Sequence, residues 1–330
     1  MPDQRPTLPR RDFSRLLAGL PLALAVLPAA AQAAPWTMAT EYPATTVSGE
    51  GIALFASRLS EESGRRLAVA PAYEAMKSAD IVAAIREGKL AAGCAFAGAL
   101  GRIDPMFLLP SLPFVMARES DARRLLDKAR GLYAGQFERE GQRLLYATPW
   151  PATGLWAKKP IMTPADLTGL KLRVYDATGV AVFTAARALP ANLSFADTMP
   201  RLSDDSIDAV LSSGDGGSGR KLWEYLPHFI EIGYAFPLSF ATLGTALYAA
   251  LAADLQAAVD RAASTTQAQQ WTRLATRVEE NYTRLRANKV TITAADKISP
   301  ALRAALVGAA ATAVAAWKRD AGAEAAALVP

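Results

Sequence analysis

Apolar residues recur along this chain with two different spacings, and segments with one spacing alternate with segments that have the other. In LKLRVYD (170–176) leucines and a valine alternate with Lys171, Arg173 and Tyr175, the period-2 pattern of a half-buried strand. In GEGIALFASRLSEESG (49–64) the apolar residues recur every three or four positions, which is typical of a helix with one buried face. The chain therefore mixes strands and helices.

The order of the two patterns predicts the class of fold. We expect strands at 36–43, 66–73, 90–98, 142–150, 170–176, 191–195, 229–234, 242–251 and 290–293. We expect helices at 49–64, 78–89, 119–141 and 177–189, within 199–211, and over 300–327. Strands that alternate with helices predict an α/β fold with mostly parallel sheets covered by helices.

Residues 252–289 contain no proline or glycine and predict one very long helix or two abutting ones. Such a helix would be about 57 Å long, more than one small domain, so we expect it to span two lobes. We place lobe I at 34–150 plus about 238–278, and lobe II at 151–237 plus about 279–330. Two such lobes form a two-lobed, type II-like binding-protein fold with a central ligand cleft that closes by hinge motion.

The first 33 residues have the features of an export signal. The paired arginines Arg10 and Arg11 precede an apolar run of about 15 residues, too short to span a bilayer, and Ala31-Gln32-Ala33 offers a cleavage site. The arginine pair is similar to that of a Tat signal. We expect a mature protein that begins near Ala34 and is located in the periplasm.

Composition excludes several functions. The net charge is +5, of which the first 33 residues carry +2, so no nucleic-acid surface is expected. One cysteine (Cys94) rules out an internal disulfide and a Cys-based metal cluster, and one histidine (His228) argues against a His-rich metal site or a Ser/His/Asp triad. GDGGSG (214–219) lacks the lysine and spacing of a phosphate loop. We expect a binding protein without cofactor or metal rather than an enzyme.

Five segments, in order, resemble the periplasmic solute-binding proteins of TRAP transporters, of the C4-dicarboxylate (DctP-like) type. They are ESGRRLAV, IREGKLAAG, LPSLPFV, KKPIMTPADLTGLKLRVYD and DDSIDAVLSS. The resemblance covers essentially the whole chain after the signal and implies that Arg173 binds the carboxylate of a small organic acid. It also implies delivery to small and large membrane permease subunits. We expect the receptor to be a monomer.

Two departures from the family pattern narrow the expected ligand. A second arginine, about 20 residues before the strand arginine in many members, is missing from WPATGLWAKK (150–159), and Ser212 and Ser213 replace a polar amide. A second ligand carboxylate would then be buried without a partner, which is costly. We therefore expect a monocarboxylate.

Besides Arg173, candidate ligand contacts come from strand ends and from the segment between the lobes. They are Glu41, Tyr42, Phe96, Trp150, Thr153, Trp156, Tyr175, Ser212, Ser213 and Phe236. The two tryptophans could equally pack at a hinge, and the serines could begin a turn. The charge of Glu41 would repel an anion unless it accepts a hydroxyl.

Other functions remain open at this point. A binding protein of another uptake or sensory system would share the two lobes. An exported hydrolase would need a nucleophile and a base, yet the chain has no G-x-S-x-G motif and no metal-ligand spacing.

Overall fold

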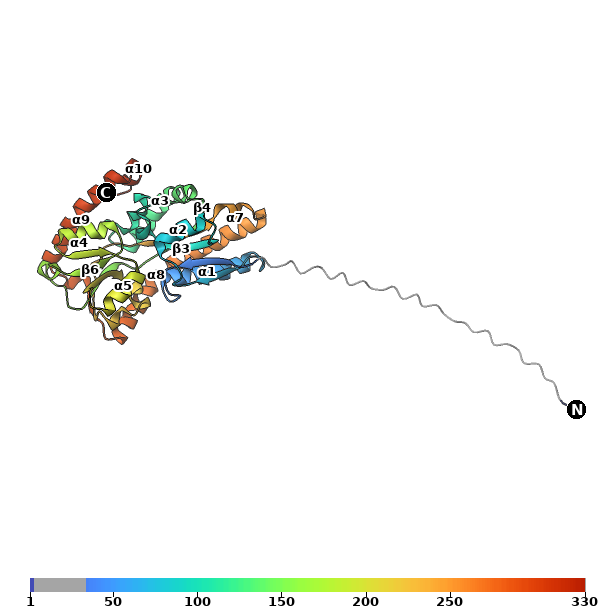
Figure 1. The fold of residues 1–330 in the computed structure, drawn as a ribbon, viewed down its shortest axis with the longest axis horizontal. Coiled ribbons are helices and arrows are strands. Elements are labelled where there is room, and N and C mark those ends of the chain that lie inside the picture. The colour runs from blue at the N-terminus through green and yellow to red at the C-terminus, as the bar shows by residue number, and fades with distance from the viewer. Residues whose placement is uncertain (3–33, 330) are drawn as a thin grey trace. The chain divides into compact units, whose positions relative to one another are not determined.

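The computed structural model describes residues 1–2 and 34–329, and the expected signal peptide lies almost wholly outside them. Residues 34–329 form one compact unit that is built around two β-sheets. We call each sheet with its helices a lobe. The strands and helices of lobe I and lobe II occupy opposite ends of the ribbon (Figure 1).

The sheet of lobe I has five strands. Their spatial order is β2 (Val69–Ala72), β1 (Trp36–Thr40), β3 (Ala92–Phe96), β10 (Leu238–Gly244) and β4 (Gln142–Pro149). β1 runs parallel to β2 and β3, whereas β10 is antiparallel to both of its neighbours. The helices of this lobe include α1 (Val47–Glu62), α2 (Ser78–Arg86), α3 (Glu119–Arg139) and α7 (Thr245–Ala249).

The sheet of lobe II has six strands. Their order is β11 (Thr291–Thr293), β9 (His228–Ile230), β5 (Thr153–Ala157), β8 (Ala209–Ser213), β6 (Lys171–Val174) and β7 (Leu189–Asn192). β5 is antiparallel to β8 and β9, and the remaining pairs are parallel. Its helices include α4 (Ala177–Ala185), α5 (Phe195–Ser203) and α6 (Gly214–Gly219).

The sheets are thus mixed, although a mostly parallel arrangement was expected. The antiparallel strands β5 and β10 each follow a passage of the chain from the other lobe. A chain that enters a sheet from the cleft starts its strand where the parallel strands end. Its direction must therefore be opposite to theirs.

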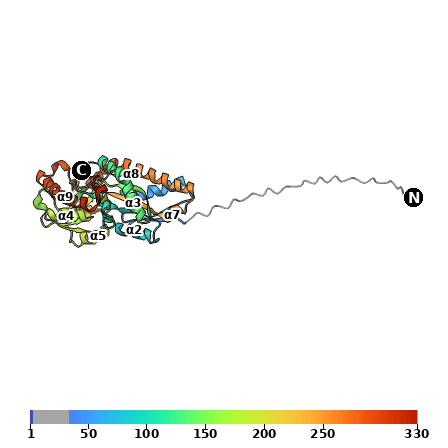
Figure 2. The same ribbon diagram turned by 90° about the horizontal axis from the view of Figure 1, so that it is seen from above.

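One long helix joins the lobes, as predicted. α8 (Ala253–Ala287) is a single helix of 35 residues, seen as the orange helix along one side in Figure 2. It packs on α1 and β4 of lobe I, and on α6 and β11 of lobe II. The alternative of two abutting helices is wrong.

The C-terminal helix also touches both lobes. α9 (Pro300–Asp320) buries Leu302 and Leu306 against lobe II, while the Trp317 indole donates to Pro105 O of lobe I at 2.7 Å. By length and composition α9 could cross a membrane, but about a quarter (28%) of its apolar window is buried in these contacts. The helix predicted over 300–327 is divided at Gly322, where φ is 82°, and continues as α10 (Ala323–Ala326).

Three apolar cores stabilise the lobes. One face of the lobe I sheet packs Phe107, Tyr133 and Phe137, and the other face packs Phe55 and Tyr146 together with the first turns of α8. The third core fills lobe II and continues through Tyr42 and Trp150 into lobe I. The continuity of this third core shows where the two lobes meet.

Several segments differ from the sequence-based expectation, among them β8, which no predicted strand covered. The strand expected over 242–251 ends at Gly244 and gives way to α7. Residues 153–157, interpreted only as a passage between lobes, form the central strand β5. GDGGSG, for which no helix was predicted, forms the short helix α6, and the Ser213 hydroxyl caps it by accepting from Gly216 N at 3.1 Å.

Candidate functional site

Arg173 extends from β6 into the space between the lobes, although only 4% of its surface is exposed. Its Nε donates to Leu193 O at 2.8 Å and its Nη1 to Leu211 O at 3.1 Å. Nη2 has no hydrogen-bond partner among residues 1–2 and 34–329. These two carbonyls hold the guanidinium in place, while the edge at Nη2 stays free to bind a ligand.

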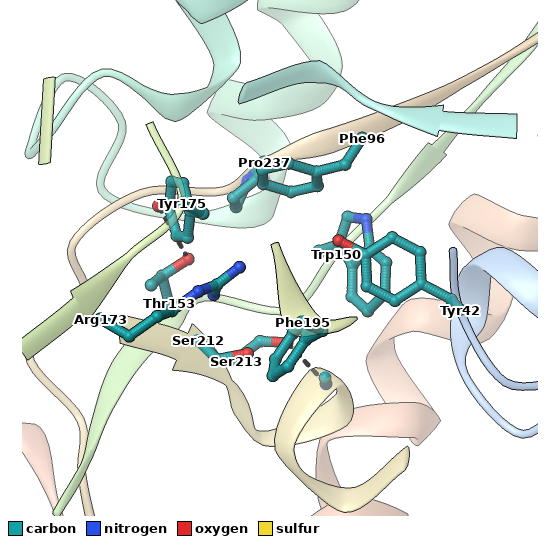
Figure 3. A pocket seen from close by; sticks show the side chains of 11 residues that line it. Tyr42, Phe96, Trp150, Thr153, Arg173, Tyr175, Phe195, Ser212, Ser213 and Pro237 are labelled. Atoms are coloured by element: carbon teal, nitrogen blue, oxygen red, sulfur yellow. Dashed lines mark hydrogen bonds between the residues drawn. The ribbon is translucent and has the colours of Figure 1, made fainter. Parts of the chain in front are cut away.

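A cavity with an empty volume of about 300 Å³ lies at this free edge. Its lining residues come from both lobes: Tyr42, Phe96, Trp150, Thr153, Arg173, Tyr175, Phe195, Ser212, Ser213, Gly216 and Pro237. Figure 3 shows the guanidinium directed into the space that these side chains surround. Eight of the eleven candidate residues therefore meet at one place.

Lobe I and the segment that leaves it contribute aromatic rings. The centroids of Tyr42 and Trp150 lie 4.7 Å apart, and Phe96 lies 6.4 Å from each of them in edge-to-face contact. The Trp150 indole nitrogen donates to Ser239 Oγ at 2.9 Å, which fixes the ring in place. These contacts give a rigid apolar wall of the kind that excludes water from a bound ligand.

Lobe II contributes hydroxyl groups beside Arg173. The Tyr175 and Thr153 hydroxyls lie 3.4 Å apart, within hydrogen-bonding distance. The Ser213 hydroxyl is occupied as the cap of α6, whereas that of Ser212 has no protein partner within the described residues. The polar wall thus offers one guanidinium edge and a few neutral hydroxyls, a set that suits a single carboxylate.

Burial changes the proton affinities of this site. Burial lowers the pKa of Arg173, although an arginine remains charged at any physiological pH. Burial also raises the pKa of Asp176 to about 7, against the opposing effects of Gly179 N–H and of Arg173. Asp176 Oδ1 accepts from Gly179 N at 2.7 Å, while Oδ2 is buried without a partner.

A second, wider cavity adjoins the first and shares Tyr42, Phe96, Arg173 and Tyr175 with it. Its empty volume is about 1130 Å³. The added lining includes the charged residues Glu41, Lys77, Arg102 and Asp197 and the polar Asn192. Arg173 therefore borders both cavities.

Three candidate residues do not line the first cavity. Trp156 lies beneath α6, with its indole nitrogen donating to Ser213 O at 3.1 Å, and Phe236 is buried in a lobe I core. Glu41 directs its carboxylate at two backbone N–H groups, of Ser78 at 3.1 Å and of Phe195 at 2.7 Å. Strand position alone could not show which way these side chains turn.

Three lining residues were missed: Phe195, Gly216 and Pro237. The Arg173 guanidinium carbon lies 4.4 Å from the Phe195 ring centroid, a cation–π contact. Phe195 had been assigned to the end of a strand, but it begins α5 after the N-cap Ser194. The pattern S-F-A-D, with an acidic residue three positions after the serine, is the capping signal that would have indicated this helix.

The glycines of α6 have a packing reason. A β-carbon on Gly217 would lie 2.2 Å from the Trp156 indole, so only glycine lets α6 rest on that ring. Within the described residues, no group of three or more His, Cys, Asp or Glu side chains could hold a metal ion. The site is therefore built from one arginine, hydroxyls and aromatic rings.

A cavity between two α/β lobes whose described lining offers a guanidinium, hydroxyls and aromatic rings is typical of a ligand-binding protein for small anions. The family model of the bacterial extracellular solute-binding proteins, family 7 (DctP), matches residues 38–320. The chain therefore belongs to this family, and it is a solute receptor of the TRAP type rather than an enzyme.

Solved structures agree with this assignment. DctP7 of Bordetella pertussis, an extracytoplasmic solute receptor binding pyroglutamic acid, is 26% identical with a TM-score of 0.85, over 90% of this chain and 98% of that one. A marine metagenome TRAP protein specific for pyroglutamate is 25% identical, with a TM-score of 0.84 over 90% and 97%. A Shewanella oneidensis receptor with bound succinate shares the fold at 18% identity, with a TM-score of 0.82 over 89% and 99%.

Proposed function

We propose that this protein binds a small monocarboxylate between its lobes through a salt bridge to Arg173. The observation that carries the proposal is the orientation of this buried guanidinium: Leu193 O and Leu211 O hold its Nε and Nη1, and the group is directed into the cavity. A planar guanidinium edge matches the two oxygens of a carboxylate.

The rest of the cavity favours one carboxylate rather than two. The other polar groups of its lining are hydroxyls, and Arg173 is the only charged residue among them. A second carboxylate would be buried without a counter-charge, which is costly. A compact acid with a neutral polar group fits this lining better.

Pyroglutamate has this chemistry: one carboxylate and one neutral lactam on a small ring. Two solved relatives at 25–26% identity bind it. We therefore place pyroglutamate, or a cyclic monocarboxylate of similar size, first among the ligands of this chain. The aromatic rings of Tyr42, Phe96 and Trp150 would cover the ring of such a ligand.

The proposal extends to the cellular role. The receptor is exported through the Tat pathway by the signal at 1–33, closes as a monomer on its ligand in the periplasm, and delivers it to TRAP permease subunits. Its lobes comprise 34–150 with about 238–278, and 151–237 with about 279–330. Replacing Arg10 and Arg11 by lysine tests the export route, since a Tat substrate would then remain in the cytoplasm.

A thermal-shift panel tests the ligand assignment. The panel contains L-pyroglutamate, other cyclic and linear monocarboxylates, the dicarboxylate succinate and pyroglutamide, the neutral amide. A ligand at 100 times its Kd stabilises the folded protein by about 2.7 kcal/mol. We expect monocarboxylates to raise Tm and succinate and the amide not to. No shift with any acid would overturn the proposal.

A further inference from the structure

A single carboxylate joins the two lobes at the edge of the cavity. Glu41 follows β1 of lobe I and is 7% exposed. Its Oε2 accepts from Ser78 N at 3.1 Å, and Ser78 is the first residue of α2 in the same lobe. Its Oε1 accepts from Phe195 N at 2.7 Å, and Phe195 is the first residue of α5 in lobe II.

Both helix starts depend on this carboxylate. The first backbone N–H groups of a helix have no partner within the helix, and a negative charge there is favourable. The N-cap of α2, Lys77, makes no side-chain cap bond, so Glu41 replaces the missing cap. At α5 the cap Ser194 serves Asp197 N, which leaves Phe195 N to Glu41.

The residue held from lobe I is also part of the ligand site. The ring of Phe195 lies 4.4 Å from the Arg173 guanidinium carbon and 6.2 Å from the Tyr42 ring. The hydrogen bond that Glu41 accepts from Phe195 N therefore joins lobe I directly to Phe195, the residue whose ring lies against the Arg173 guanidinium. Bonds within lobe II alone could not make this connection.

We propose that Glu41 is a positioning residue that holds the cleft closed and keeps Phe195 against Arg173. The inference rests on the proposed function, because it assigns Glu41 a role in ligand retention rather than in ligand contact. In an open cleft one carboxylate oxygen would lose its partner in lobe II and return to water. On closure this oxygen gives up its contacts with water and accepts a charge-assisted hydrogen bond from Phe195 N.

A reciprocal contact lies elsewhere on the lobe boundary. Asp215 of lobe II accepts from Val47 N, the first residue of α1 in lobe I, at 2.8 Å. Its other oxygen is bound by Arg277 and Asn281 of α8. Removing Asp215 would leave Arg277 buried without this partner and endanger the fold. Glu41 is therefore the better residue to test.

Glu41→Gln is a sharp test, because glutamine keeps the size but has one acceptor oxygen for two N–H groups. Glu74→Gln is the matched control. It is the same substitution in another carboxylate of lobe I that pairs with lobe II, here Arg220, but its side chain is 52% exposed. The Arg220 side chain is only 13% exposed, but the Glu74 carboxylate stays half in water, so its loss should cost less than that of the buried Glu41.

The first measurement is the dissociation rate of L-pyroglutamate by stopped-flow tryptophan fluorescence, since Trp150 lines the cavity. We expect Glu41→Gln to dissociate about 10-fold faster or more, with an association rate near that of the wild type and Glu74→Gln unchanged. Equal dissociation rates for Glu41→Gln and the wild type would overturn the proposal.

The second measurement requires no ligand. Spin labels on the exposed positions Glu87 of lobe I and Lys159 of lobe II report the distance between lobes. We expect Glu41→Gln to shift the ligand-free distribution to longer distances than Glu74→Gln does. If the wild type binds no acid of the panel, the proposed function has failed. Identical distance distributions for Glu41→Gln and Glu74→Gln would overturn the role of Glu41, and this result does not depend on any ligand.

Discussion

The two lobes face the same cavity with different chemistry. Lobe II presents Arg173 and the hydroxyls of Thr153 and Ser212, which can form directed bonds to a ligand. Lobe I presents the rings of Tyr42 and Phe96, which can cover a ligand but cannot discriminate its charge. A ligand can thus be recognised on one lobe and enclosed by the other. The difference predicts that mutations on the two walls have distinct effects on selectivity.

The largest effect is expected at the anchor. Arg173→Ala should weaken binding of the carboxylate by about 100- to 1000-fold, because losing one partner of a buried ion pair costs roughly 3–4 kcal/mol, the lower part of the usual range. Arg173→Lys should restore only part, since an ammonium keeps the charge but lacks the planar fork. Calorimetry with L-pyroglutamate measures both variants. An affinity near that of the wild type in Arg173→Ala would remove the carboxylate anchor from this site.

A smaller, less selective effect is expected on the covering wall. Phe96→Leu removes aromatic area that packs on Trp150 and Tyr175, and should weaken binding by up to about 10-fold. The loss should be similar for the acid and for its weakly bound amide, because apolar contact does not discriminate charge. Competition titrations compare the two ligands. If Phe96→Leu weakened binding of the acid more than binding of the amide, the aromatic wall would also contribute to recognition of the carboxylate.

Asp176 should make binding depend on pH. Its pKa of about 7 in the fold means that it ionises near neutral pH, and the new charge then competes with the ligand for Arg173. Affinity should fall by a few-fold from pH 6 to pH 8, and Asp176→Asn should remove this trend while the amide oxygen still caps α4 at Gly179 N. Calorimetry across this pH range is the measurement, and an unchanged slope in the variant would contradict it.

The same group affects stability, with a definite sign. Its pKa is raised by folding from 3.8 to about 7, so the folded state holds the proton more tightly than the unfolded state. The resulting stabilisation is complete below about pH 4 and is lost as the pH rises through 7. Chemical denaturation should therefore show a flatter pH profile for Asp176→Asn than for the wild type.

A comparably small effect is expected for a neutral hydroxyl. Ser212→Ala should weaken binding by about 2- to 10-fold, because a neutral hydrogen bond contributes roughly 0.5–1.5 kcal/mol. Ser213→Ala differs, because that hydroxyl caps α6 and its loss should lower Tm as well. Parallel binding and melting curves separate the two serines. A Tm loss in Ser212→Ala would assign that hydroxyl a structural role.

Regular patterns along the chain predicted the α/β class, the long helix α8 and the two lobes. Arg173 could be placed because period-2 alternation located it in a strand, and the family resemblance added a role. The antiparallel strand β5 was missed because TGLWA is apolar on both faces and shows no alternation. A fully buried strand in a mixed sheet has no polar side to mark its period.

From the sequence, the site residues could be predicted only as residues near the ends of strands. Tyr42, Phe96 and Ser212 lie where strands end or just beyond, and they do reach the cavity. Trp156 and Glu41 lie at similar positions, but the first supports α6 and the second reaches two helix starts. Which way such a side chain turns depends on partners distant in sequence. Local patterns contain no information about those partners.

The continuity of α8 has a mechanical consequence. Where two lobes are joined only by loops, they can turn about a few backbone bonds at almost no elastic cost. Here a helix of 35 residues without proline or glycine passes from one lobe to the other. A change in the angle between the lobes must therefore bend or twist a helix about 52 Å long. Such a helix has a preferred curvature, and bending it away from that curvature produces a restoring force. The angle at which the empty receptor rests is therefore set in part by the stiffness of a helix that touches no ligand.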